Sequence, residues 1–266
     1  MKRFRLSRRS LAIPYAIFLL AFVIAPLCVL FYYAFTDSEG SFTFSNLISF
    51  FTNPNTTGTL CYSLAVAFVT TLVCLLIAYP VAYILAKSSL KNKTVWLLVF
   101  ILPMWINFSL RITALKEILT LLEGNLAYFQ FLNTIIGMTY DFLPFMILPI
   151  FNSLSGIDSA YIEAAKDLGA APAAAFFQVT LPLSVPGIMS GILMVFLPSM
   201  TNYVILDMLY NSTYIMGSLI GSYFAAYDWN GGAMIALILL AIISVVTLLT
   251  RDTGQEEEAK KGGALL

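Results

Sequence analysis

Histidine is absent from the 266-residue chain, and charged residues make up only 11% of it. Without histidine, a His-rich zinc site and a Ser–His or Cys–His nucleophile are both excluded. The sequence also has no GxxxxGKS or GxxxxGKT phosphate-binding loop, so the chain has no evident means of hydrolysing ATP itself. We therefore expect a protein that is not an enzyme and that binds no metal or cofactor of its own.

The scarcity of charge accompanies an excess of apolar residues, which form 60% of the chain. A soluble domain usually carries about 25% charged residues. One soluble core cannot hide so much apolar surface, and the long uncharged runs therefore indicate lipid as the solvent. Cys28, Cys61 and Cys74 lie in or at the start of such runs, so we interpret them as small hydrophobic residues rather than disulfide or metal ligands.

Six apolar segments are candidates for membrane-spanning helices, each of which needs roughly 20 mostly apolar residues. The segments are residues 11–35, 60–86, 94–112, 133–153, 183–206 and 231–250. The third is short and contains Arg111, and the fourth contains Asp141. The sequence thus predicts an all-α integral membrane protein with six transmembrane helices, in which residues 1–10 precede the membrane domain 11–250 and residues 251–266 form a disordered tail.

Basic residues gather on one side of this six-span arrangement. Of the 14 Lys and Arg residues, only Arg111 and Lys116 fall on the other side. Because basic loops stay in the cytoplasm, both termini are predicted to be cytoplasmic. The opposite loops, 36–59 and 207–230, contain acidic residues and no basic residue, which predicts a mildly negative outer face.

The cytoplasmic loop between the fourth and fifth predicted spans contains a pattern for a short helix over residues 159–168. Asp158 suits the N-cap position, and Gly169 suits the left-handed position that follows a helix end. So short a helix is unstable alone in water. We therefore expect it to rest on a partner surface, either its own bundle or another protein.

The same loop carries a spaced motif. Glu163–Ala165, Gly169 and the later run Val179–Pro182 match EAA-x3-G-x9-I-x-LP, with Val179 in place of the usual isoleucine. This pattern resembles the signature loop of the permease subunits of binding-protein-dependent ABC importers. The resemblance implies a type I importer permease fold with its core over residues 60–250.

In that family the loop, here residues 155–182, contains a coupling helix that docks on the ATPase subunit. The resemblance implies that the ATPase-coupling residues are Glu163, Ala164, Ala165 and Gly169. The alternative is that Glu163 and Gly169 only solubilise and cap a loop helix.

The resemblance also implies a set of partners. These are a second homologous permease subunit, two ATP-binding subunits that use ATP and Mg, and an extracytoplasmic substrate-binding protein. The expected location is the bacterial cytoplasmic membrane, with no nucleic-acid partner. An ion-coupled secondary transporter is the alternative from another class, but it leaves the EAA spacing unexplained.

Three stretches bear on the substrate: residues 13–37, 140–149 and 198–207. They resemble the B-type permease of the spermidine/putrescine importers, which implies polyamine transport. Permeases for iron, sulfate or phosphonate share much of this pattern and stay as alternatives. An anion importer would need basic residues along its pathway, and Arg111 is the only one near membrane level, which disfavours sulfate and phosphonate.

A polyamine cation that crosses a low-dielectric pathway needs carboxylates or aromatic ring faces as temporary partners. The candidates are Asp141, Asp207, Asn202, Tyr203 and Trp105.

Each of three candidates has a structural alternative. Asp141 instead pairs with Arg111, Asp207 is an ordinary loop acid, or Trp105 belongs to the core or the interfacial belt. The sequence leaves these alternatives open, and it does not decide whether residues 113–132 form a loop or an interfacial helix.

Overall fold

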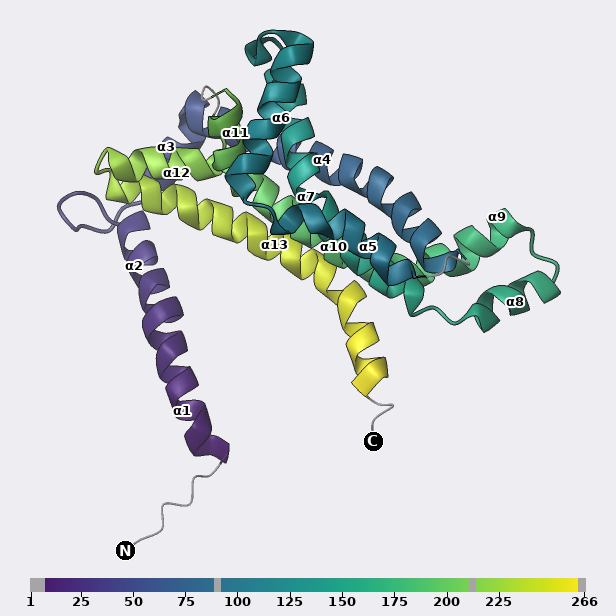
Figure 1. The fold of residues 1–266 in the computed structure, drawn as a ribbon. Helices are drawn as coiled ribbons and strands as arrows, with labels where there is room; N and C mark the ends of the chain where they lie inside the picture. Colours follow the sequence, from purple (N-terminus) through teal and green to yellow (C-terminus); the bar gives the residue numbers. More distant parts are fainter. Residues whose placement is uncertain (1–7, 89–91, 211–213, 263–266) are drawn as a thin grey trace, which may run out of the picture. The chain divides into compact units, whose positions relative to one another are not determined.

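The computed structural model describes residues 8–88, 92–210 and 214–262, most of which are helical (Figure 1). This part of the chain has no β-strand, only an isolated bridge between Thr36 and Phe42. The predicted all-α class is therefore confirmed. The chain divides into two compact units: unit 1 is Met1–Gly58 with Ser218–Ile242, and unit 2 is Thr59–Gly217 with Ile243–Leu266.

Five helical stretches in the described residues are long and apolar enough to cross a membrane. They are Ile13–Ala34, Pro54–Lys87, Leu126–Ser155, Pro172–Thr201 and Trp229–Thr250. Each overlaps a predicted span, because a long uncharged run is the strongest sequence signal for such a helix. The fifth predicted span, 183–206, is misplaced at both ends, since the helical stretch begins at Pro172 and stops at Thr201.

The predicted span 94–112 is not one straight helix. α5 (Lys93–Ile101) continues into the short 3₁₀ turn η2 (Leu102–Trp105), and α6 (Phe108–Glu123) then leaves at a bend of 93°. The described chain therefore has six spans only if this bent pair counts as one.

The bend has a local cause. Pro103 has no N–H to continue the helical ladder. Asn107 then starts a new helix, because its side-chain oxygen accepts hydrogen bonds from the backbone N–H groups of Ser109 and Leu110 at 3.0 and 3.4 Å. The open question about residues 113–132 is answered, since they hold the rest of α6 and the 3₁₀ turn η3 (Leu126–Phe129).

Unit 1 contains the first span, the short helices α3 and α12, and the start of the last span. Its elements are α1 (Arg8–Leu19), the π-helical turn η1 (Leu20–Ile24), α2 (Ala25–Ala34), α3 (Ser45–Thr52), most of α12 (Met216–Ala225) and the start of α13 (Trp229–Gly262). Ala34, Ala233 and Met234 form its buried core. Asn230 donates to the carbonyl oxygens of Tyr33 and Thr36 at 3.0 and 2.6 Å, which fixes the end of α2 against α13.

Unit 2 holds the larger core. Its helices include most of α4 (Pro54–Lys87), α7 (Gln130–Ser155), α8 (Ser159–Asp167), α9 (Pro172–Ala175), the π-helical turn η4 (Phe176–Thr180), α10 (Leu181–Thr201) and α11 (Tyr203–Leu209). α7 and α10 pack along each other over much of their lengths. The largest fully buried side chains of α7 are Met138, Met146, Ile147, Ile150 and Leu154.

Two glycines permit this close packing. A Cβ on Gly187 would meet the Ser153 side chain and lie 2.7 Å from the Pro149 carbonyl oxygen, and one on Gly191 would lie 2.6 Å from the Met146 sulfur. The spacing of the glycines is GxxxG, which lets helix backbones approach closely in a membrane.

The C-terminal tail differs from expectation. Residues 251–262 continue α13, so the prediction of a disordered end is wrong for them, while 263–266 lie outside the described residues. Glu256 and Glu257 each precede a lysine by four residues, Lys260 and Lys261, a spacing that supports a helix in water.

Candidate functional site

The short predicted helix of the loop between α7 and α10 exists as α8, Ser159–Asp167. Asp158 is its N-cap, and its carboxylate accepts a hydrogen bond from the Ala160 N–H at 3.0 Å. This bond satisfies one of the backbone donors that the first turn leaves free, and the negative charge suits the positive end of the helix dipole. Lys166 lies in the last turn, where a positive charge is favourable.

α8 ends in a Schellman motif centred on Gly169. The Ala170 N–H donates to the Ala165 carbonyl at 3.0 Å, and the Gly169 N–H donates to the Lys166 carbonyl at 2.8 Å. Gly169 has a φ of +86°, which an L side chain rarely adopts. Apart from Gly169 and its two chain neighbours, no atom of the described residues lies within 4 Å of the place where its Cβ would be, so glycine is required for backbone conformation and not for space.

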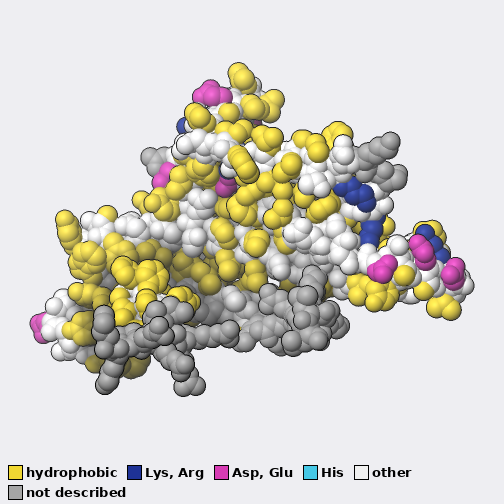
Figure 2. All heavy atoms as spheres, turned by 60° about the horizontal axis from the view of Figure 1, so that its bottom comes forward, with side chains coloured by type: hydrophobic (Ala, Val, Ile, Leu, Met, Phe, Trp, Pro, Cys, Tyr) yellow, Lys and Arg dark blue, Asp and Glu magenta, His cyan; other side chains and the backbone are white. Residues whose placement is uncertain are grey.

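No residue of α8 is buried. Glu163 and Ala164 are exposed and Ala165 is half-buried, while the large apolar side chains of Tyr161 and Leu168 are 61% and 90% exposed. In Figure 2, charged side chains gather over α8 and the adjoining loop at the right of the view, while hydrophobic side chains cover much of the remaining visible face. Three of the predicted coupling residues therefore lie on one exposed, capped helix, and Gly169 forms its C-terminal stop.

The loop is attached to the bundle at both ends. On the entry side, the Lys87 ammonium at the end of α4 donates to the Ile157 carbonyl at 3.0 Å. On the exit side, α9 begins with Pro172, and the π-helical turn η4 joins it to α10. Thr180, inside the second half of the motif, is buried.

The π-helical turn fits the sequence. Pro182 lacks an N–H and would clash with the carbonyl of the residue four positions earlier in a regular helix. The wider turn just before it relieves this clash. The first half of the EAA motif therefore lies on the exposed helix α8. Its second half lies in a distorted helical segment, η4 and the start of α10, that packs against the bundle.

Arg111 and Asp141 form a buried ion pair between α6 and α7, each with 7% of its side chain exposed. The guanidinium also lies 5.8 Å from the centre of the Tyr140 ring. Of the two alternatives for Asp141, the structure shows the pairing with Arg111. The Arg111 Nε and Nη1 atoms are buried and have no hydrogen-bond partner among the residues that the structure describes.

The other candidate pathway residues lie at two helix breaks. Trp105, 85% exposed, ends the η2 turn, so it is not part of the protein core. Asn202 separates α10 from α11, and Tyr203 and Asp207 are exposed on α11. Trp105 makes no hydrogen bond or ring contact with these three among the described residues.

Two contacts around the break after α10 were not predicted from the sequence. A Cβ on Gly217 would collide with the Thr201 carbonyl, so α12 begins against the last turn of α10. The Met216 N–H donates to the Ser63 hydroxyl at 2.9 Å, which ties the same segment to α4. A glycine far from any turn signal was the only clue in the sequence.

The geometry agrees with a comparison to known families. A family model described as "binding-protein-dependent transport system inner membrane component" matches residues 78–251. The chain belongs to this family, and it is a membrane-spanning permease subunit of an ABC importer.

Particular relatives within this class are also similar over most of the chain. The spermidine/putrescine transport system permease protein PotB of Haemophilus influenzae is 32% identical over 250 residues, covering 86% of this chain and 87% of the relative. PotB of Escherichia coli is 33% identical over 206 residues, covering 71% and 75%. A PotB homologue of Mycoplasma pneumoniae is 34% identical over 198 residues, covering 65% and 68%.

Solved structures share the fold at low sequence identity. A bacterial ABC transporter involved in the import of the acidic polysaccharide alginate contains a chain with a TM-score of 0.72 at 15% identity, covering 93% of this chain and 94% of that one. The MetNI methionine ABC transporter gives a TM-score of 0.56 at 17% identity, covering 75% and 94%. These likenesses concern the fold alone.

Proposed function

We propose that the chain is the permease subunit of a polyamine importer that carries spermidine or putrescine into the cell. The names of relatives that align with most of the chain support this substrate class. The loops 36–59 and 207–230, which contain acidic residues and no basic one, are compatible with a polycationic substrate.

The observation that carries the coupling role is the exposed helix α8. A helix this short needs a partner to stay folded, yet none of its residues is buried by the described chain. We assign that partner to an ATP-binding subunit, which uses ATP and Mg. Glu163, Ala164, Ala165 and Gly169 are the docking positions, and α8 passes the closure of the ATPase to the spans. The full transporter also has a second permease subunit and an extracytoplasmic binding protein.

The same assignment sets the orientation. Lys87 and Lys93 lie at the same end of the helices as the loop that contains α8. Lys87 donates to the Ile157 carbonyl and Lys93 donates to the Ala86 carbonyl. Basic residues remain on the cytoplasmic side. We infer that α8 and both termini face the cytoplasm, and that the α11–α12 end faces outward.

For the pathway, the exposed Trp105, Tyr203 and Asp207 offer ring faces and a carboxylate to an ammonium group, and Asn202 directly precedes Tyr203. Asp141 differs from these, because its carboxylate is held by Arg111. A substrate ammonium has to replace the guanidinium before it can use Asp141.

ATP hydrolysis by the reconstituted transporter, measured with its binding protein and with or without putrescine, tests the proposal. Glu163→Ala should weaken substrate-stimulated hydrolysis roughly fivefold to tenfold, as expected for the loss of about 1–1.4 kcal/mol of docking energy. Asp167→Ala is the matched control, because Asp167 is acidic and exposed on the same helix but stands at one of the unspecified positions of the motif. Equal losses in both variants would contradict the specific role of Glu163, and stimulation only by another solute would contradict the polyamine assignment.

A further inference from the structure

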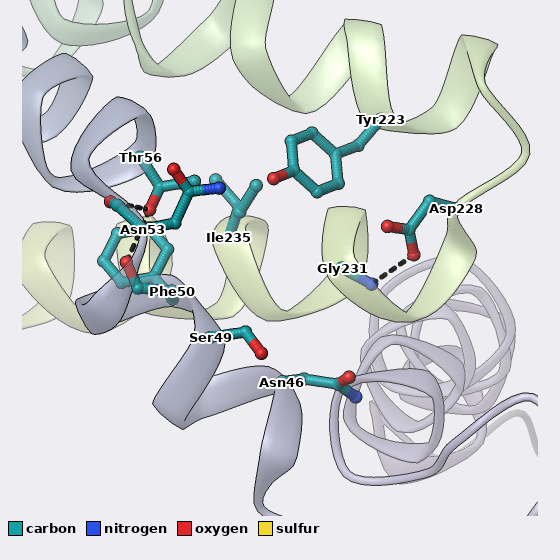
Figure 3. Close-up of a pocket in the computed structure, with 9 residues that line it drawn as sticks. All are labelled: Asn46, Ser49, Phe50, Asn53, Thr56, Tyr223, Asp228, Gly231 and Ile235. Atoms are coloured by element: carbon teal, nitrogen blue, oxygen red, sulfur yellow. Dashed lines mark hydrogen bonds between the residues drawn. The ribbon is translucent and has the colours of Figure 1, made fainter.

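A small polar pocket lies within unit 1, and most of its lining residues belong to the acidic loops 36–59 and 207–230 (Figure 3). Its volume is about 160 Å³, and it lies among α3, the start of α4, α12 and the start of α13. The lining residues that matter are Asn46, Ser49, Phe50, Tyr223, Asp228 and Ile235.

The pocket contains one carboxylate, from Asp228, whose Oδ1 accepts a hydrogen bond from the Gly231 N–H at 2.8 Å as the N-cap of α13. The second oxygen makes no hydrogen bond or ion pair with the described residues. No Lys or Arg occurs between residues 10 and 58 or between 218 and 242, so unit 1 has no basic residue after Arg9. Asp228 is exposed to solvent, and any positive partner for its carboxylate comes from outside residues 10–58 and 218–242.

The neighbouring groups add neutral oxygens and apolar walls. The Ser49 and Tyr223 hydroxyls form no hydrogen bond within the described part of the chain, and Tyr223 extends from α12 toward Ile235 (Figure 3). Asn46 donates its amide N–H groups to the carbonyls of Ala34 and Thr36, which leaves its side-chain oxygen as an acceptor. Phe50 and Ile235 supply the apolar surface.

This combination fits one chemical class. A divalent metal would be held by several carboxylates, and the described residues contain no group of three or more metal-ligating side chains. A primary ammonium instead needs one carboxylate and a few neutral acceptors, with an aromatic face nearby. The volume holds about five water-sized groups, enough for an ammonium and a short methylene chain.

We propose that this pocket is a receiving site for a primary ammonium group on the outer face of the permease. Two sources carry that group: one end of the polyamine substrate, or a lysine of the binding protein. The first source rests on the proposed polyamine substrate, and the second rests only on the binding protein and the orientation that the proposed function includes.

The test uses the full transporter in nanodiscs, with Tyr223 replaced by 3-fluorotyrosine so that its fluorine NMR signal reports the pocket alone. In one arm putrescine is added without the binding protein, with 1,4-butanediol as an uncharged probe of similar length. In the other arm the ligand-free binding protein is added without putrescine.

Asp228→Asn keeps an N-cap residue, so α13 still begins normally, but it removes the charge. We expect it to weaken the response roughly threefold to tenfold. Ser49→Asp, which adds a second carboxylate at an exposed position, should strengthen the response. Asp37→Asn, an exposed carboxylate of the same unit outside the pocket, is the control and should leave it unchanged.

These changes in the putrescine arm identify the substrate as the source, and in the binding-protein arm they identify a cationic group of the binding protein, which replacement of its exposed lysines by glutamine then assigns to a lysine. No response of Tyr223 in either arm, an equal response to butanediol, or no effect of Asp228→Asn would overturn the proposal. If putrescine fails to stimulate ATP hydrolysis while the binding-protein arm still depends on Asp228, the polyamine assignment fails and the ammonium site stands.

Discussion

The α7–α10 pair and α8 belong to the same unit of the molecule and are separated by only a few residues of chain, yet different forces hold them. α7 and α10 depend on tertiary packing, with close contacts at Gly187 and Gly191 and a buried ion pair at Asp141. α8 buries no side chain and depends on local hydrogen bonds at its two ends. The first region fixes the shape of the permease, and the second presents a surface.

This contrast predicts two kinds of variant. Changes between α7 and its neighbours should reduce stability and assembly. Changes in α8 should leave the fold intact and reduce only the coupling to ATP hydrolysis.

Replacing Arg111 with Met should give the largest loss of stability, about 3–5 kcal/mol, because it leaves the buried Asp141 carboxylate without a partner. Thermal unfolding of the purified permease in detergent measures the effect. The double variant Arg111→Met with Asp141→Leu should recover most of it, since neither charge is then buried alone. A double variant as unstable as the single one would show that the pair itself, and not the orphaned charge, stabilises this site.

Gly187→Ala should cost about 1–3 kcal/mol, because the new methyl group forces α10 away from Ser153 and the Pro149 carbonyl. Gly221→Ala is the matched control, since no atom lies within 4 Å of its added Cβ. The yield of monodisperse protein and its unfolding temperature compare the two. Equal behaviour would mean that α7 and α10 tolerate separation.

In α8, Gly169→Val should cost about 1–2 kcal/mol locally, because a β-branched residue is strained at a φ of +86°. We expect substrate-stimulated ATP hydrolysis to fall while the unfolding temperature of the permease stays unchanged. Gly169→Asn should be milder, since asparagine tolerates the left-handed region. A fall in the unfolding temperature with Gly169→Val would break the contrast between the two regions.

The smallest effect is expected for Asp158→Ala, which removes the N-cap of α8 and costs about 1 kcal/mol of helix stability. Asp158→Ser keeps a capping oxygen and should restore coupling. The ATPase assay used for Glu163→Ala measures both variants. Identical loss in the alanine and serine variants would point to the charge of Asp158 rather than its cap.

The same contrast explains what could be predicted from the sequence. α8 was placed nearly to the residue, because its limits are set by Asp158 and Gly169, whose side-chain and backbone preferences are local. The long uncharged spans were also found, because hydrophobicity over about 20 residues is a strong signal.

What the sequence did not reveal either lies inside a continuous apolar run or depends on contacts between distant residues. The bend between α5 and α6 and the stop of α10 at Thr201 lie inside apolar runs that read as continuous. The pairing of Asp141 with Arg111 was one of two open alternatives, since the relative placement of α6 and α7 is not a local property. The end of α10 is packed by Gly217, which carries no turn signal in the sequence.

The capped but unpacked state of α8 has a kinetic consequence. Its backbone N–H groups are shielded from water only by the helix itself, so they exchange with solvent deuterium through local opening rather than through unfolding of the bundle. Amides in the middle of α7 exchange only through much larger openings, because their helix is buried. In one deuterium-exchange experiment the slow amides of α7 therefore serve as an internal standard. Compared with them, the exchange rate of residues 159–167 measures how often a partner protein occupies the exposed surface of α8.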